Sequence, residues 1–539
     1  MREGARLRIH FAGCWVQPLE RRRPALAPKF ARLMTPADPT TLVLLRLSGE
    51  ISTKARETRW RFVSQLLRNA GDALRSEGVA YTLTRRHDRI FVELAHPRGV
   101  AALARVFGVQ SVSVAVRGPG DSLEAIVARG AEVFGDAVRG KRFAVRARLV
   151  GKPRGLGFGS RDIQIALGEK LRANALRVDL DNPEVTAQVE VHEGRAYYFT
   201  ERSAGEGGLP LATEGRALAL VSGGFDSAVA AWQMMRRGLA LELAFFNLGG
   251  RTHRAGTLRV MHALATRWAY GTNPRLHAVD FDAVSRDLQA HAEPRYWQVI
   301  LKRLMLRAAD RIARELACPA LVTGEALGQV SSQTLVNLAT ISAATQLPIL
   351  RPLIGANKHE IIDLAHRIGT GPISATVAEY CALVPRRPAT AASLAAVEAE
   401  EAKLDATLLE RAVAAREVIG VRDADPFALA LPELSLEAVP RGAVVIDLRT
   451  RDEFKAWNLP GSVQLDFARA LEALHAFARE QCYVAVCDYG LKSAHLAELM
   501  RKQGLDAYHF RGGTDALRKW AKRGSAPTEH GTEPATFRN

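Results

Sequence analysis

The sequence predicts a multidomain protein in which small α+β units are followed by α/β units with parallel sheets. Three observations lead to this prediction. The chain has 539 residues, enough for about three to five domains. Hydrophobic residues make up 47% of it and charged residues 24%, a balance typical of globular proteins. The order of strand-like and helix-like segments changes near residue 217, from mixed to regularly alternating.

Composition also limits the classes of function. No run of 18 apolar residues occurs, so we expect no membrane-spanning helix. The five cysteines form no C-x-x-C pair, which argues against a disulfide framework or a zinc ribbon and favours a reducing compartment, the cytoplasm. Residues 1–202 carry 35 Lys/Arg against 21 Asp/Glu, whereas the remainder is nearly balanced. This asymmetry indicates a polyanion partner for the first part, a soluble basic face being the alternative.

The first units follow a basic N-terminal extension. Residues 1–40 lack hydrophobic periodicity and predict a flexible arm, with Met34 as an alternative start of the chain. Two α+β units are then expected, the first over 41–97 and the second over 98–202. Their expected strands are 41–47, 81–84, 89–94, 143–150, 186–191 and 196–199, and their expected helices are 60–73, 122–134 and 163–175.

A basic segment of the second unit is the candidate nucleic-acid contact. The window 139–161 holds eight Lys/Arg and no acidic residue. Arg146 and Arg148 share the outer face of the expected strand, because side chains alternate along it. Lys152 and Arg154 follow in a glycine-rich loop. Such residues predict contacts with the phosphates of RNA or DNA. The alternative is a solvated edge strand with a flexible loop.

The strand-like run 217–221 leads into the first candidate catalytic site. Residues 222–227 read SGGFDS and a helix-like segment follows. The two glycines permit a tight turn with inward-pointing amides, and the hydroxyls of Ser222 and Ser227 add donors beside the helix N-terminus. This arrangement predicts a phosphate-binding loop, in which Asp226 belongs beside a metal ion or a group that it polarises. An ordinary strand-to-helix turn is the alternative.

Alternating strands and helices continue from 241–246 to about residue 370. Residues 389–419 are rich in alanine and glutamate and predict one long helix. Three prolines between residues 421 and 440 indicate a linker. A last α/β unit follows, with expected strands 444–448 and 483–487 and expected helices 468–479 and 493–503.

Cys487 marks the second candidate site. It ends a strand-like run and begins a short loop before a helix, with Lys492 close by in sequence. Loop amides and a helix N-terminus favour the thiolate form of a cysteine at such a position. A buried structural cysteine is the alternative.

Several of these segments resemble a known family. SGGFDS resembles the pyrophosphate loop of the PP-loop ATPases, which adenylate a carbonyl-type oxygen. Residues 296–303, 322–334 and 350–353 resemble the ATP-site segments of the tRNA 4-thiouridine synthetases. The resemblance implies that ATP contacts Leu220, Val221, Ser222, Gly223, Gly224, Asp226, Ser227, Lys302, Gly324 and Gln333. As a cation among apolar neighbours, Lys302 suits phosphate binding, although a surface helix lysine is the alternative.

The resemblance covers about residues 41–525 and implies a domain order. The expected parts are a ferredoxin-like domain (41–97), a THUMP RNA-binding domain (98–202), a PP-loop ATPase domain with a Rossmann-like parallel sheet (203–388), a helix and linker (389–439), a rhodanese α/β domain (440–525) and a flexible tail (526–539). The rhodanese resemblance rests on 445–449, 453–454, 459–462 and 510–513, and on the loop that begins with Cys487.

The family also has a cysteine in the context that surrounds Cys381. The resemblance therefore implies that Cys381 forms a transient disulfide with Cys487. Such a thiolate would break the S–S bond that remains after a persulfide has attacked. Cys482 is interpreted as structural.

These resemblances imply an ATP- and Mg²⁺-dependent tRNA sulfurtransferase. It would adenylate O4 of a tRNA uridine, at position 8 by resemblance, and replace that oxygen with sulfur from a Cys487 persulfide supplied by a cysteine desulfurase. Three alternatives remain: a PP-loop enzyme with another nucleophile, a sulfur carrier for the thiazole of thiamine, and an RNA-binding protein without ATPase activity. The sequence leaves the reductant and the oligomeric state open, a homodimer being one possibility.

Overall fold

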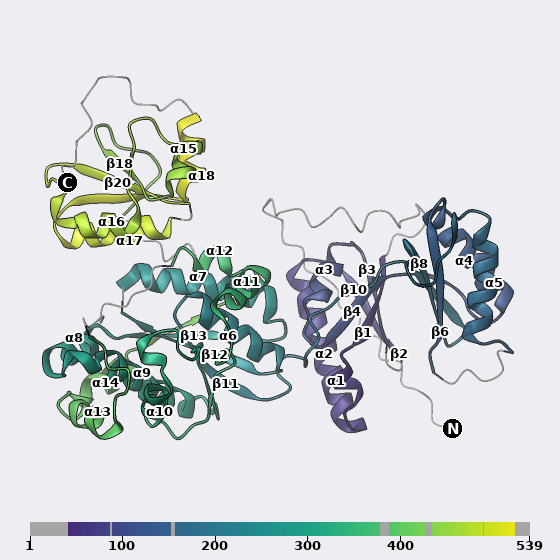
Figure 1. The fold of residues 1–539 in the computed structure, drawn as a ribbon, viewed down its shortest axis with the longest axis horizontal. Helices are drawn as coiled ribbons and strands as arrows, with labels where there is room; N and C mark the ends of the chain where they lie inside the picture. The colour runs from purple at the N-terminus through teal and green to yellow at the C-terminus, as the bar shows by residue number, and fades with distance from the viewer. Residues whose placement is uncertain are drawn as a thin grey trace. The chain divides into compact units, whose positions relative to one another are not determined.

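A computed structural model describes residues 41–86, 89–151, 157–248, 250–377, 387–425, 434–488 and 490–522. The chain divides into two compact units. The first runs to Gly215 and includes the short segments Met235–Leu239 and Arg267–Thr272, and the second holds the rest. Each unit contains two sheets (Figure 1). The expected multidomain architecture, with α+β domains before α/β domains, is confirmed.

The first sheet is antiparallel and has the ferredoxin-like composition of strands and helices. Its strands, in spatial order, are β10 (Ser203–Ala204), β4 (Val109–Val114), β1 (Thr41–Leu47), β3 (Arg89–Leu94) and β2 (Tyr81–Arg86). The helices are α1 (Gly49–Ser52), α2 (Arg56–Ser76) and α3 (Gly99–Ala104). Because β4 pairs with β1, this sheet extends past the division expected after residue 97. The sequence did not reveal this pairing, because helix α3 separates β4 from the earlier strands of the sheet.

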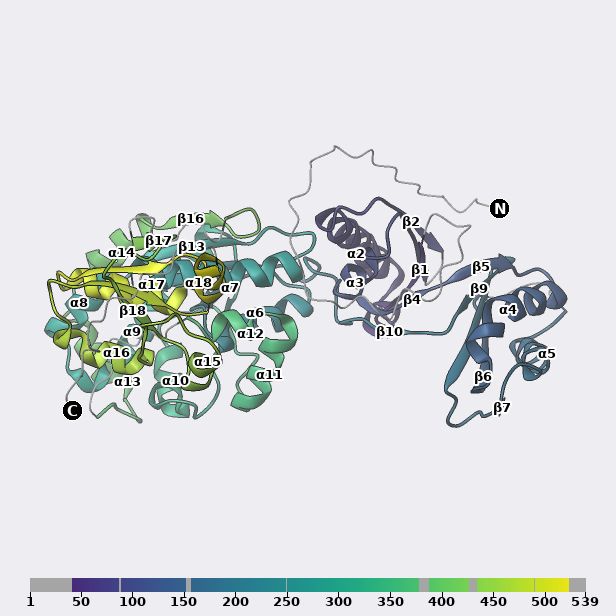
Figure 2. The ribbon, with the colours of Figure 1, turned by 90° about the horizontal axis from the view of Figure 1, so that it is seen from above.

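The second sheet belongs to the THUMP domain. Its strands, in spatial order, are β5 (Val116–Pro119), β9 (Arg195–Phe199), β8 (Val185–His192), β6 (Arg142–Leu149) and β7 (Arg177–Val178). Helices α4 (Leu123–Val138) and α5 (Ser160–Arg172) lie side by side against this sheet (Figures 1 and 2). Ser122 caps α4 by accepting a hydrogen bond from the Ala125 amide, the interaction that begins many helices.

The two sheets of the first unit are joined through β1. Its residues are buried on both faces, because Val43 and Leu45 pack in the ferredoxin-like core while Leu44 packs against Tyr197 and Phe199 of β9. A buried ion cluster adds to this contact. Arg46 and Arg89 both bind the Glu190 carboxylate, at 2.8 and 2.9 Å. Burial opposes the charge of Glu190, but the two arginines keep its pKa below the ordinary value.

The third sheet is the Rossmann-like sheet of the PP-loop domain. Its strands, in spatial order, are β15 (Ile349–Leu350), β14 (Leu321–Val322), β11 (Arg216–Val221), β12 (Ala240–Asn247), β13 (Arg275–Asp280) and β16 (Glu417–Gly420). All neighbours are parallel except β13 and β16. The helices are α6 (Phe225–Arg236), α7 (Gly250–Trp268), α8 (Asp282–His291), α9 (Trp297–Glu315), α10 (Leu335–Ser342), α11 (Lys358–Ile368) and α12 (Gly371–Ser374). Parallel order places the ends of β11 and β14 at one edge, where the first site lies.

The single long helix expected over 389–419 is wrong. The segment forms α13 (Leu394–Glu401), α14 (Ala406–Ala414) and strand β16. Asp405 separates the two helices. Its side chain accepts a hydrogen bond from the Thr407 amide and caps the N-terminus of α14. Composition alone did not reveal this cap.

The fourth sheet is the parallel sheet of the rhodanese domain. Its strands, in spatial order, are β17 (Ser435–Leu436), β21 (Asp506–Phe510), β20 (Cys482–Val486), β18 (Val444–Asp447) and β19 (Val463–Gln464). The helices are α15 (Arg451–Ala456), α16 (Phe467–Glu472), α17 (Leu491–Lys502) and α18 (Gly513–Lys522). β17 pairs with β21, so this sheet includes two residues of the segment expected to be a linker.

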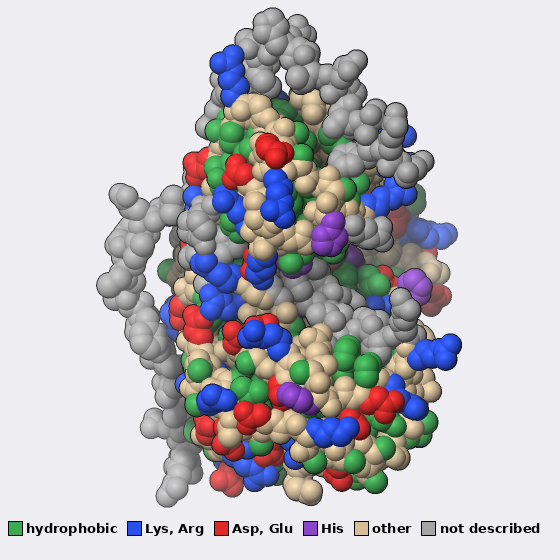
Figure 3. Space-filling model, turned by 90° about the vertical axis from the view of Figure 1, so that its left-hand side faces the viewer, with side chains coloured by type: hydrophobic (Ala, Val, Ile, Leu, Met, Phe, Trp, Pro, Cys, Tyr) green, Lys and Arg blue, Asp and Glu red, His purple; other side chains and the backbone are tan. Residues whose placement is uncertain are grey.

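Charge is mixed on the surface of the second unit. On the face that Figure 3 shows, basic and acidic side chains are interspersed, as the near balance of charge after residue 202 indicates. Within the part of the chain that the structure describes, no helix is long and apolar enough to cross a membrane.

Two candidate active sites

The first site is the turn between β11 and α6. The Ser227 hydroxyl accepts a hydrogen bond from the Ser222 amide at 3.2 Å and lies 3.4 Å from the Ser222 hydroxyl. Gly223 has φ +76°, a conformation that favours glycine. The turn therefore places two hydroxyls and the first amides of α6 together, as a phosphate-binding loop requires.

Asp226 is held by two side chains that the sequence analysis did not single out. Lys358 Nζ lies 2.7 and 3.0 Å from the two Asp226 carboxylate oxygens, and Gln329 Nε2 donates to one of them at 3.0 Å. Lys358 is the first residue of α11, and its ammonium lies over the Phe225 ring. Asp226 thus pairs with a lysine from α11, a partner that the sequence did not predict.

Lys302 is also in this domain, and its partner is Glu325. Lys302 Nζ lies 3.3 Å from one Glu325 oxygen, while Arg351 Nε and the Thr323 hydroxyl bind the other at 2.7 and 3.1 Å. Burial alone would raise the pKa of Glu325, but Lys302 and Arg351 hold it below the ordinary value. Lys302 is therefore one of two cations that share a single buried carboxylate.

The remaining expected ATP residues are Leu220, Val221, Gly324 and Gln333. Leu220 and Val221 are the last residues of β11. Gly324 must be small, because a Cβ there would lie 2.8 Å from backbone atoms of Asp226 and Ser227. Gln333 is nearly buried, and its side-chain oxygen accepts a hydrogen bond from the Ala326 amide at 3.4 Å. Gly324 thus packs directly against the phosphate-binding loop. Gln333 stabilises the segment that contains Gly324 through its hydrogen bond to Ala326.

The second site is the loop after β20. Cys487 is buried, and the Ser493 amide in the first turn of α17 donates to its sulfur at 3.4 Å. The Ser493 hydroxyl lies at the same distance. Gly490 has φ +76° and turns the chain into the helix. Cys487 therefore faces the positive end of α17, the surroundings that favour a negatively charged sulfur.

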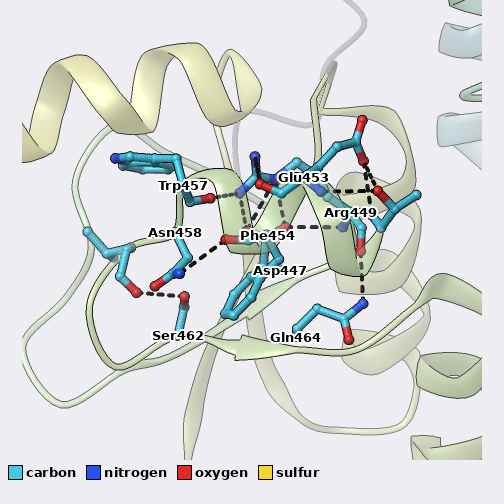
Figure 4. Close-up of polar contacts among 10 residues, drawn as sticks. Asp447, Arg449, Glu453, Phe454, Trp457, Asn458, Ser462 and Gln464 are labelled. Carbon is cyan, nitrogen blue, oxygen red and sulfur yellow. Dashed lines mark hydrogen bonds and ion pairs between the residues drawn. The ribbon is translucent and has the colours of Figure 1, made fainter.

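A buried ion pair supports this loop from β18. Arg449 Nη2 lies 2.6 Å from Asp447 Oδ2, and the same nitrogen donates to the Trp457 carbonyl at 2.6 Å (Figure 4). Gln464 donates to the Arg449 carbonyl at 2.9 Å. Burial and Glu453 raise the pKa of Asp488, next to the cysteine, and Arg449 opposes that rise. These contacts thus fix the segment after β18, and its arginine acts electrostatically on the residue next to Cys487.

Three expected site residues, Cys381, Lys152 and Arg154, lie outside the described residues. Val377, four positions before Cys381, packs close to Gly223 and Gly256.

Part of the positive charge in the basic window, residues 139–161, is paired with carboxylates. Arg146 and Arg148 are exposed on β6, and Arg146 donates to the Leu180 carbonyl at 2.6 Å. Arg139 pairs with Asp136, and Arg142 with Glu184. These partner carboxylates lie outside the window in sequence, so the absence of acidic residues within it does not leave all of its charge unpaired. Strand β6 is also not an edge strand, since it pairs with β7 and β8.

Four families of known proteins match consecutive parts of the chain. The matches are the ThiI ferredoxin-like domain over residues 42–113, the THUMP domain over 121–201, the family described as thiamine biosynthesis protein (ThiI) over 212–406, and the rhodanese-like domain over 433–519. The expected sequence of domain types agrees with these matches.

Individual proteins match over most of the chain. A tRNA sulfurtransferase from Pyrobaculum aerophilum is 39% identical over 473 residues, which cover 87% of this chain and 96% of that protein. A tRNA sulfurtransferase from Sodalis glossinidius is 35% identical, covering 86% and 98%. The crystal structure of a 4-thiouridine synthetase–RNA complex with bound ATP is 29% identical with a TM-score of 0.62, covering 70% of this chain and 99% of that one.

Proposed function

The chain belongs to the tRNA sulfurtransferase family, and from that premise we propose that its two sites perform successive halves of one reaction. The first half adenylates O4 of a tRNA uridine, at position 8. The second half replaces this oxygen with sulfur and gives 4-thiouridine. The observation that carries the proposal is the presence, in one chain, of a phosphate-binding loop and a cysteine at a helix N-terminus, on separate sheets.

Adenylation uses the turn after β11. Uridine O4 attacks the α-phosphorus of ATP and pyrophosphate leaves. The amides and hydroxyls of Ser222 and Ser227 suit the pyrophosphate, and Lys358 adds positive charge where the leaving group gains negative charge. This step is needed because an oxygen bonded to a pyrimidine carbon is a poor leaving group, whereas AMP is a good one.

A magnesium ion fits the donor set of this site. Mg²⁺ in nucleotide sites is held by one or two carboxylates together with phosphate oxygens, and Asp226 supplies one carboxylate at the loop. When bound, the ion would neutralise charge on the polyphosphate. Lys358 and Gln329 orient the carboxylate.

Sulfur transfer uses Cys487 as a persulfide. A cysteine desulfurase supplies the outer sulfur, and the Ser493 amide and the dipole of α17 stabilise its charge. The outer sulfur attacks C4 and AMP leaves with O4. The Cys381 thiolate then attacks Cys487 Sγ, which breaks the S–S bond, leaves the sulfur on C4 and forms a Cys381–Cys487 disulfide. An external dithiol reduces this disulfide.

The THUMP domain is the proposed tRNA contact. Arg146 and Arg148 present exposed positive charge from one strand, and we propose that Lys152 and Arg154, which follow in sequence, contribute to the same contact. We place the reaction in the cytoplasm, because its substrate is tRNA and its chemistry needs reduced thiols.

The direct test is a reconstituted reaction. Purified protein carrying a persulfide is mixed with tRNA transcript, ATP and Mg²⁺. AMP and 4-thiouridine should appear in equal amounts in the first turnover. Formation of 4-thiouridine without ATP, or AMP without tRNA at the same rate, would contradict the proposal.

A second candidate function is sulfur delivery for the thiazole of thiamine. It is favoured by the description of the family that matches residues 212–406. Such delivery needs the Cys487 loop but no adenylation. A strain carrying Asp226→Ala should then grow without thiamine, whereas Cys487→Ser should require it; a thiamine requirement in both strains would contradict this separation.

A further inference from the structure

Helix α7 of the PP-loop domain contacts both the phosphate-binding loop and α17, the helix that follows the cysteine loop. On one side it touches the phosphate-binding loop: His253 Nε2 lies 3.3 Å from the Ser222 carbonyl oxygen. A Cβ at Gly223 would lie 2.9 Å from the Thr257 hydroxyl, so this helix packs tightly on the loop. Helix α7 therefore lies directly against the phosphate-binding loop.

On another side α7 binds the rhodanese domain through a buried hydrogen-bonded contact. The Thr252 amide and hydroxyl both donate to Glu498 Oε2, at 3.2 and 2.5 Å. Thr252 and Glu498 are buried, and a Cβ at Gly250 would lie 2.6 Å from Glu498 Oε1. A carboxylate at the N-terminus of a helix is electrostatically favourable. Lys502 also lies 3.5 Å from this carboxylate and shares its charge.

Glu498 lies on α17, the helix that begins at the cysteine loop. The Ser493 amide of this helix contacts Cys487 Sγ. The contact with α7 therefore fixes the helix whose N-terminus faces the reactive sulfur.

Arg259 lies farther along α7. It lies seven residues after Thr252, two helical turns along the same face and about 10 Å farther on. Its guanidinium interacts electrostatically with Cys487: burial lowers the pKa of Arg259, and Cys487 and Asp425 raise it. Arg259 acts on His509 of β21 as well. The pKa of His509 is lowered to about 4, first by burial and then by the charge of Arg259. Arg259 thus interacts electrostatically with two different elements of the rhodanese domain.

We propose that α7 is the docking helix of the sulfur-carrying domain, with Thr252 receiving Glu498, and that Arg259 is a positioning residue that stabilises negative charge on the Cys487 sulfur when the domain is docked. The sulfur that transfers would therefore be activated by a residue of the domain that adenylates the substrate. This inference rests on the proposed function for its purpose, but its test needs neither ATP nor tRNA.

The test is the rate at which iodoacetamide alkylates Cys487 in the full chain at pH 7, followed by mass spectrometry of the Cys487 peptide. Loss of a close positive charge should slow the reaction of Arg259→Gln about tenfold. Arg259→Lys keeps the charge and should stay within about threefold of the unchanged protein. Arg254→Gln is the matched control, because Arg254 is on the same helix but pairs with Glu417 of β16. Alkylation of Arg259→Gln at the normal rate would overturn the role of Arg259.

A second set of variants tests the docking from the other domain, should Arg259→Gln fail to fold. Thr252→Val and Glu498→Gln should each slow alkylation of Cys487, because the domain then spends less time beside Arg259. The two changes together should have no more effect than one, since both remove the same contact. Effects that multiply, or no effect from either, would overturn the docking contact. Failure of the proposed function would appear separately, as absent AMP or 4-thiouridine with unchanged alkylation behaviour.

Discussion

At the scale of single residues, the most informative contact is the ion pair between Asp226 and Lys358. Asp226 was predictable because it lies in SGGFDS, but Lys358 was not, because 132 residues separate the two. One signal was available in the sequence. Asn357 and Glu360 form a capping box that begins α11, and Lys358 is then at the first helical position. A lysine at the N-terminus of a helix is unfavourable because it opposes the helix dipole. Its presence there indicates that it interacts with a group outside the helix.

Lys358→Ala should reduce AMP formation about 100-fold or more, the usual effect of removing one group that stabilises charge in a transition state. Lys358→Arg should retain part of the activity. The measurement is tRNA-dependent AMP release. Lys403→Ala is the matched control, because Lys403 pairs with Glu400 on the surface. Normal AMP release by Lys358→Ala would contradict the role given to this lysine.

Cys487→Ser should abolish 4-thiouridine formation while tRNA-dependent AMP release continues, because the thiol does not contact ATP in the proposed reaction. Cys482→Ser provides the control, because Cys482 begins β20, the strand that Cys487 follows. Burial and Asp506 raise the pKa of Cys482 to about 11, so its thiol stays protonated and unreactive at neutral pH. The assay follows radiolabelled sulfur from a desulfurase to protein and then to tRNA. Labelled sulfur on the Cys487→Ser protein would reject Cys487 as the carrier.

At the scale of elements, the sequence predicts strands and helices well where periodicity is strong. The expected strand 217–221 corresponds to β11, and the expected helix 122–134 to α4 with Ser122 as its cap. Errors occur where a tertiary partner decides the outcome. Residues 417–420 become strand β16 because β13 offers an edge to pair with. The charges of Arg139 and Arg142 are neutralised by carboxylates that a sequence window does not contain.

The strand β6 carries the prediction about RNA. Charge reversal of Arg146 and Arg148 to glutamate should weaken tRNA binding and flatten the plot of log K against log salt, because fewer counterions are released. Binding is measured by filter retention between about 50 and 200 mM salt. Reversal of Arg311 is the control, because this surface arginine lies on α9 and pairs with Glu410. An unchanged salt slope in the β6 variant would show that these arginines do not contact tRNA.

At the scale of the whole molecule, the order of domain types was predictable, and the sheet boundaries were not. Motifs identify the PP-loop and the cysteine loop, because each chemistry needs particular residues at fixed spacing. Sheets recruit strands from distant segments: β10 joins the first sheet after the entire THUMP domain, and β17 joins the last sheet from the expected linker. Such pairings depend on which sheet edge is open, and a linear pattern does not contain that information.

Stability of the second unit should depend on pH through three buried histidines. Burial is the main cause that lowers the pKa of His253, His495 and His509 to about 4. They are neutral in the fold, whereas the unfolded chain protonates histidine near pH 6.5. The unfolded state therefore binds more protons between about pH 6.5 and 4, and stability falls as the pH falls through that window. Urea unfolding at pH 7.5 and at pH 5 checks this; equal free energies of unfolding at the two values would contradict it.

The most direct test of the central claim is mass spectrometry of tRNA nucleosides from a strain that lacks this protein. The account predicts that 4-thiouridine disappears and that the unchanged protein restores it. Neither Asp226→Ala nor Cys487→Ser should restore it, because each removes one half of a single reaction. Normal 4-thiouridine in the deletion strain, or its restoration by either variant, would contradict the claim that the two sites of this chain act in succession on the same uridine.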